Sequence, residues 1–161
     1  MSHAEMTTHP NDDEEHLELM SAALDGRTAT VKALLRHGVD VNARTHEGRT
    51  ALMFAIINMH PATVQELLNL GADVNAQSVA GFTPLFLAVC SGDARMVQAL
   101  LDKGADIRKT LTSGQTVLAH AAEHGFNDIV ELLKQAMNRS KDVRSQTVPK
   151  SGSVKSVLTL S

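Results

Sequence analysis

The stretch AGFTPLFLAVCSGDARMVQALLDKGAD, residues 80–106, contains the pattern on which most of the chain is built. Similar segments begin at Thr45 and Leu111 with a constant offset of 33 residues, and a further copy precedes Thr45. Positions related by this offset are called a column below. The columns that hold a single residue type include Ala22, Ala55, Ala88 and Ala121, then Val31, Val64, Val97 and Val130, and also Leu34, Leu67, Leu100 and Leu133. A period that persists through several columns indicates stacked structural repeats.

Each repeat is expected to form two short helices followed by an extended loop. Thr50 or Thr83 can cap the first helix of its repeat with the side-chain hydroxyl, and Pro84 suits the first helical turn. Gly104 can end the second helix in a left-handed conformation. The turn-rich Asp-Val-Asn-Ala segment after such a glycine predicts a hairpin-like finger that leads to the next repeat. The alanine column is small where helices of adjacent repeats must touch.

These residues resemble the ankyrin repeat, and the resemblance covers about residues 14–137. It implies an all-α solenoid of four helix–turn–helix units joined by β-hairpin-like fingers, with units at about 14–44, 45–77, 78–110 and 111–137. The column that holds His in the family is occupied by Met53, Phe86 and Ala119. Met59 stands where other units have Gly, so this turn is either strained or rebuilt around Pro61.

The two ends of the chain differ from the repeats in charge. Residues 1–13 are expected to be an acidic flexible leader, and residues 138–161 a basic, Ser-rich flexible tail. The net charge of −3 averages an acidic repeat region and this basic tail. An acidic body lacks the positive surface that duplex binding requires, so no nucleic-acid partner is expected. The tail could contact anionic surfaces, be phosphorylated, direct targeting, or only solvate the end.

The sequence favours a cytoplasmic, monomeric protein. Cys90 is the only cysteine, which excludes an internal disulfide and suggests a reducing compartment. The opening MSHAEMTTHP lacks the features of a secretory signal, and the longest apolar runs are too short to span a membrane. No membrane insertion is therefore expected.

Neither catalytic residues nor cofactors are predicted. No nucleophile motif or phosphate-binding glycine loop occurs. His120 and His124 have the i, i+4 spacing of zinc ligands with Glu123 between them, but the His-Glu-x-x-His order is absent and no third ligand is evident. The structural interpretation of this pair is preferred over a metal site, and no resident metal is expected.

The resemblance to ankyrin repeats implies a non-catalytic protein-binding module, which uses its concave face and finger tips to bind a folded partner. The residues at the corresponding positions, called the predicted binding surface below, are Leu24, Arg49, Ile57, Val79, Phe82, Cys90, Gln115 and His124. A small adaptor or regulatory subunit fits this surface. The alternative is a delivered effector whose repeats bind a host protein and whose basic tail directs export or localisation.

A second implication of the resemblance concerns two asparagines of the fingers. Asn42 and Asn75 match a position that is hydroxylated in some ankyrin-repeat proteins, whereas the third member of the column is Arg108. The turn-forming chemistry of asparagine accounts for both residues without modification.

Overall fold

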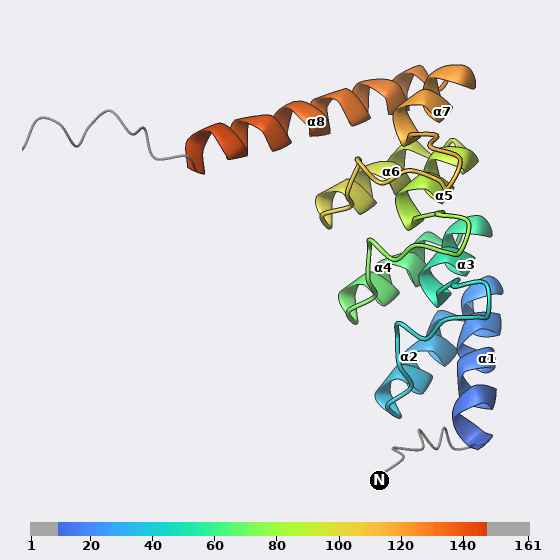
Figure 1. The fold of residues 1–161 in the computed structure, drawn as a ribbon. Helices are drawn as coiled ribbons and strands as arrows, with labels where there is room; N and C mark the ends of the chain where they lie inside the picture. The colour runs from blue at the N-terminus through green and yellow to red at the C-terminus, as the bar shows by residue number, and fades with distance from the viewer. Residues whose placement is uncertain (1–9, 148–161) are drawn as a thin grey trace, which may run out of the picture.

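The computed structural model describes residues 10–147. Within this range the secondary-structure elements are all α-helices, which follow one another in pairs separated by loops. Helices α1, α3, α5 and α7 form a first row, and α2, α4, α6 and the start of α8 form a second row beside it (Figure 1). The helix bounds are α1 Pro10–Leu24, α2 Thr28–Arg36, α3 Ala51–Ile57, α4 Pro61–Asn69, α5 Pro84–Ser91, α6 Ala94–Asp102, α7 Val117–Glu123 and α8 Asn127–Thr147. The all-α repeat solenoid is therefore confirmed.

Three helices begin at residues whose side chains satisfy free backbone N–H groups. The Thr83 hydroxyl accepts a hydrogen bond from the Phe86 N–H at 3.1 Å, and Thr116 accepts one from Ala119 in the same way. Asp93 caps α6 by accepting from the N–H groups of Arg95 and Met96. Thr50 differs, because its hydroxyl is buried and makes no hydrogen bond. Capping thus fixes three of these starts, and packing must hold α3.

The core lies along the interface between successive first-row helices. All four residues of the alanine column have no exposed surface, as the repeat pattern predicts. Leu67, Leu100 and Leu133 are also fully buried and bring the second row onto the same core. Each unit consequently buries its apolar face against the next one, so the core is continuous along the stack.

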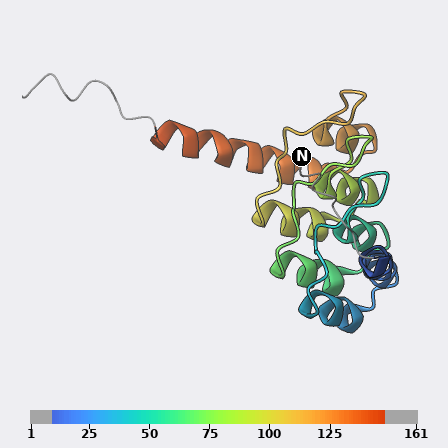
Figure 2. The ribbon, with the colours of Figure 1, turned by 60° about the horizontal axis from the view of Figure 1, so that its bottom comes forward.

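The fingers are the loops at residues 38–50, 71–83 and 104–116, called the first, second and third finger. Each tip is closed by two backbone hydrogen bonds. In the second finger the Ser78 N–H donates to the Phe82 carbonyl at 2.9 Å, and the Gly81 N–H donates to the Ser78 carbonyl at 2.9 Å. The hairpin-like strand pairing expected from the sequence is not seen: between residues 10 and 147 only the isolated bridge between Thr110 and Thr116 forms. A closed tip of five residues leaves little backbone for a ladder of strand hydrogen bonds. Neighbouring fingers run side by side (Figure 2), and they use part of this backbone for hydrogen bonds to each other.

The backbone conformation of Met59 distinguishes between the two alternatives for the turn between α3 and α4, a strained turn or a turn rebuilt around Pro61. Its φ of 57° is positive, close to the values of 69–71° at Gly26, Gly92 and Gly125 in the same column. The turn is therefore kept and not rebuilt, and a non-glycine residue carries the left-handed conformation. Its side chain is 55% exposed, so it finds room in solvent.

Met59→Gly is expected to stabilise the protein by about 1 kcal/mol, because glycine adopts a positive φ without the steric cost that Met59 bears. Thermal unfolding monitored by circular dichroism measures the change. Met59→Ala is the matched control, since it shortens the side chain but keeps the conformational cost. Equal or lower stability of the glycine variant would show that the turn is not strained.

The last helix departs from the expected domain boundaries. α8 runs past residue 137 to Thr147, so residues 138–147 are helical and not part of a flexible tail. The reason lies in one column of the repeat. Gly38, Gly71 and Gly104 lie just beyond the ends of the other second-row helices and have a positive φ. The fourth residue of this column is Met137, which does not favour such a helix end, and α8 continues through it. α8 projects away from the stack in both views (Figures 1 and 2).

At the other end, α1 begins at Pro10, so the last part of the expected leader is helical. Proline suits a first helical turn, and the acidic Asp12 and Asp13 that follow interact favourably with a helix N-terminus. The rest of the leader and residues 148–161 of the expected tail lie outside the described residues. Among the helices of the described range, none has both the length and the apolar composition needed to cross a lipid bilayer.

Candidate functional site

Four members of the predicted binding surface lie at the ends of the first-row helices. Leu24 and Ile57 are the last residues of α1 and α3, Cys90 lies one residue before the end of α5, and His124 follows α7. Ile57 is 43% exposed, Cys90 and His124 are also exposed, and Leu24 is half-buried. The helix ends therefore offer an apolar group in three repeats and an imidazole in the last one.

The carbonyl of Leu24 is held by the next repeat. It accepts hydrogen bonds from the Asn58 amide at 2.8 Å and from the His60 ring at 2.9 Å. Both donors flank Met59, so the left-handed turn directs two side chains back onto the end of α1. This arrangement fixes the spacing between Leu24 and Ile57.

The first two finger tips contribute an ion pair and an exposed valine. Arg49 is exposed and pairs with Glu47 of the same tip, with Nε and a carboxylate oxygen 3.1 Å apart. Val79 is 74% exposed, the highest value among the large apolar side chains of the described range. Its N–H donates to the Glu47 carbonyl at 2.9 Å, which places the Val79 backbone against the first finger.

Phe82 is less available than the sequence indicates. Its ring packs edge-on against the buried Phe86, with the ring centroids 5.6 Å apart, and the residue is half-buried. Phe82 thus joins the finger to the core as well as lining the surface. Gln115 of the third finger is also engaged, because its amide donates to the Glu123 carboxylate at 2.8 Å.

Cys90 is the one thiol of the surface. Partial burial raises the pKa of the Cys90 thiol above its ordinary value, and a hydrogen bond with its own backbone acts weakly in the opposite direction. A protonated thiol is a poor nucleophile, so Cys90 serves here as a small apolar group.

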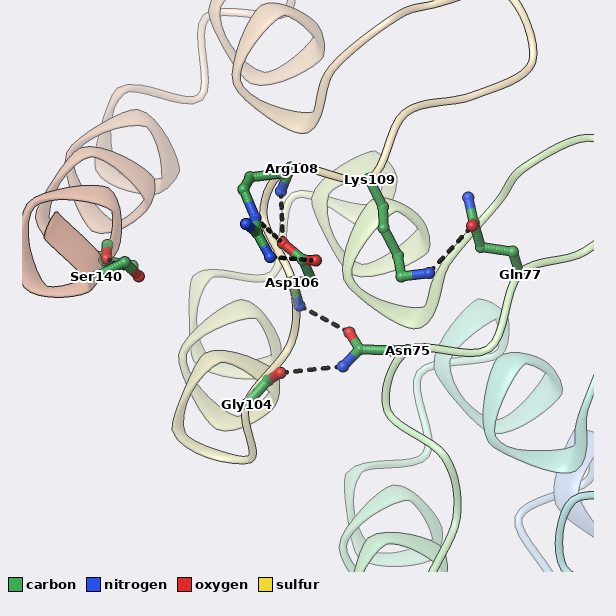
Figure 3. Close-up of polar contacts among 8 residues, drawn as sticks. Asn75, Gln77, Gly104, Asp106, Arg108, Lys109 and Ser140 are labelled. Atoms are coloured by element: carbon green, nitrogen blue, oxygen red, sulfur yellow. Dashed lines mark hydrogen bonds and ion pairs between the residues drawn. The ribbon is translucent and has the colours of Figure 1, made fainter. Parts of the chain in front are cut away.

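Neighbouring fingers are tied together by asparagines and not by the histidines typical of related repeats. The Asn75 amide donates to the Gly104 carbonyl at 3.1 Å and its oxygen accepts from the Asp106 N–H at 2.7 Å (Figure 3). Asn42 makes the same two bonds to Gly71 and Asp73 of the second finger. Met53 and Phe86, which occupy the histidine column, are fully buried and fill that space with apolar packing.

This chain of asparagine bonds ends at Arg108. Its guanidinium folds back onto Asp106, with two N–H···O distances of 2.9 and 3.0 Å (Figure 3). The Arg108 side chain, assisted by the Arg108 backbone N–H, lowers the pKa of Asp106 below its ordinary value. Arg108 therefore closes the last finger where a following finger would otherwise bond.

A groove of about 760 Å³ lies between the third finger, α6 and α8. Its lining includes Ile107 of the third finger, Leu101 of α6, and Met137, Ser140 and Val143 of α8. Figure 3 shows Ser140 on α8 together with Asp106 and Arg108 of the third finger. No member of the predicted binding surface lines it. This groove was not predicted, because the last helix was expected to end at residue 137. Met137, which stands where the other repeats have Gly, is the signal in the sequence that could have revealed it.

The end of α7 brings together His120, Glu123 and His124. The two imidazole centroids are 4.2 Å apart, and the His124 ring also stacks on Phe126 at 5.9 Å. His120 is half-buried and packs against Phe86 at 5.2 Å. Both side chains thus make packing contacts within the fold.

A family model described as ankyrin repeats, in three copies, matches residues 4–78 and 76–147 of the chain. The two matches together cover every repeat in the stack and the whole of α8. Comparison with curated proteins finds no match.

Proposed function

The chain belongs to the ankyrin-repeat family, whose members are generally non-catalytic protein–protein interaction modules, and from this premise we propose that it binds a folded partner protein through the predicted binding surface. The observation that carries the proposal is the exposure of Ile57 and Val79, 43% and 74%, on successive repeats of a rigid stack. A patch of large apolar side chains that stays exposed is typical of interaction surfaces, and we propose that these two side chains belong to one such patch.

The rest of the surface supports this proposal by its chemistry. The Arg49–Glu47 ion pair lies at the tip of the first finger, next to the backbone of Val79, and provides a charged rim beside an apolar centre. An apolar centre with a polar rim is the usual anatomy of a protein interface. The asparagine ties between fingers keep the tips in register, so little order has to be gained on binding.

Ile57→Asp is expected to weaken partner binding by roughly 30-fold or more, the loss of about 2 kcal/mol that marks a central interface residue. Affinity capture from the native cell extract identifies the partner, and biolayer interferometry with the purified partner measures the loss. Leu70→Asp is the matched control, because Leu70 is 42% exposed and lies at a helix end as Ile57 does, but at the end of α4 in the second row.

One further variant completes this experiment. Val79→Asp should weaken binding in the same way as Ile57→Asp, while Phe82→Ala is avoided because Phe82 also packs on the core. All variants should unfold at the same temperature within a few degrees. Equal loss in Leu70→Asp and Ile57→Asp, or no loss in either, would contradict the proposed surface.

A small monomeric adaptor or regulatory subunit of the cytoplasm is the form of this function that we propose. The single cysteine, which has no partner in the chain for a disulfide, supports a reducing compartment. The contrast in charge between the acidic repeat region and the basic C-terminal residues favours a second candidate function. The protein would then be a delivered effector whose basic C-terminal residues direct localisation. Deletion of residues 138–161 distinguishes the two: an unchanged cellular location supports the adaptor, and a changed location supports the effector.

A further inference from the structure

The last turn of α7 places three metal-ligating side chains together. One ring nitrogen of His120, one of His124 and a carboxylate oxygen of Glu123 all lie within 4.8 Å of one another. They come from positions i, i+3 and i+4, which share one face of a helix. The sequence showed the two histidines but not whether the Glu123 carboxylate turns towards them, and the structure supplies this third group.

Each of the three side chains is held by a contact that leaves ligand capacity unused. His124 Nδ1 bonds to the His120 carbonyl at 2.9 Å, so Nε2 is the nitrogen left for a metal. Glu123 accepts from Gln115 through one oxygen, Oε2. His120 is held by its ring contact with Phe86, and its Nδ1 is buried without a hydrogen bond. Such outer contacts orient the ligands of metal sites in proteins.

The electrostatics at this end of α7 also favour a cation. The carbonyl end of a helix carries partial negative charge, and Glu123, the last residue of α7, adds a carboxylate there.

From this geometry we infer that His120, Glu123 and His124 form a Zn²⁺ site that keeps water in a fourth position. Two imidazoles and one carboxylate are a ligand set that zinc accepts with an open position. Metal bonds of about 2.1 Å in a tetrahedral site bring ligand atoms to about 3.4 Å of each other. The three side chains reach this spacing by moving about 1 Å inward, through rotations that the exposed Glu123 and His124 can make.

Isothermal titration of the full chain with ZnCl₂ tests the site. The unmodified protein should bind one zinc ion at this site, and Glu123→Gln and His124→Ala should each weaken that binding at least about tenfold. Glu123→Gln keeps a group that can accept from Gln115. His37→Ala is the matched control, because His37 is also exposed at the end of a helix but lies away from the cluster, and it should bind zinc as the unmodified protein does.

A second measurement locates the metal. Long-range proton–nitrogen spectra resolve the imidazoles of the eight histidines, and zinc should shift the signals of His120 and His124 first. Zinc affinity unchanged in both Glu123→Gln and His124→Ala would overturn the site. So would a first shift confined to His3, His9 and His16, which would place the metal in the acidic N-terminal segment.

Discussion

Ala88→Leu should destabilise the protein by about 1–3 kcal/mol, the usual cost of forcing extra methylene groups into a packed core. Ala88 has no exposed surface and lies in α5, which packs between α3 and α7. A leucine there must displace the neighbouring first-row helices, because the stack offers no side on which the larger group can expand. The effect arises between repeats and not within one.

Chemical denaturation followed by circular dichroism measures this loss. Ala62→Leu is the control, because Ala62 is exposed in α4 and the same substitution there should change stability by less than about 0.5 kcal/mol. Equal stability of the two variants would contradict the assignment of the alanine column to the contact between repeats.

Asn75→Ala should cost about 1–3 kcal/mol, since it removes two hydrogen bonds worth about 0.5–1.5 kcal/mol each. Both bonds cross from the second finger to the third, to the Gly104 carbonyl and the Asp106 N–H. The substitution therefore weakens the junction between two units rather than one loop. Hydrogen exchange should consequently become faster in the third finger as well as in the second.

Asn138→Ala provides the matched control for this substitution. Asn138 is exposed on the projecting part of α8, so its loss should leave stability within about 0.5 kcal/mol of the unmodified protein. Unchanged exchange in the third finger of Asn75→Ala would show that the asparagine does not couple the two units.

Features that repeat with the 33-residue offset could be predicted from the sequence, because each was observed several times. The helix pairs, the buried alanine column and the caps of Thr83 and Thr116 are of this kind. Thr50 occupies the same column yet makes no capping bond, and only its burial in the structure reveals this. The repeat pattern predicts a backbone position more reliably than it predicts a hydrogen bond.

Features that break the repeat were harder to predict. The continuation of α8 through Met137 depends on the absence of one glycine, and the groove beside it depends on where that helix then passes. The half-burial of Phe82 depends on Phe86, a substitution of the histidine typical of the family, and no other repeat repeats this pair. Single deviations of this kind have no second copy in the sequence to check them against.

The candidate site shows the same division. The column alignment correctly identified helix ends and finger tips, and Ile57, Val79, Cys90 and His124 are exposed there. It could not show that Gln115 is engaged by Glu123, or that this carboxylate lies beside two imidazoles, because both depend on side-chain direction. Whether these residues bind a partner stays a prediction.

Hydrogen–deuterium exchange of the protein with its captured partner tests the central claim, that the binding surface lies on the first-row helix ends and the finger tips. The account predicts slower exchange at residues 45–49 and 78–82 and at the ends of α3 and α5 in the complex. Residues of α2 and α4 should exchange as in the free protein. Protection confined to α2, α4 or the groove beside α8 would contradict it.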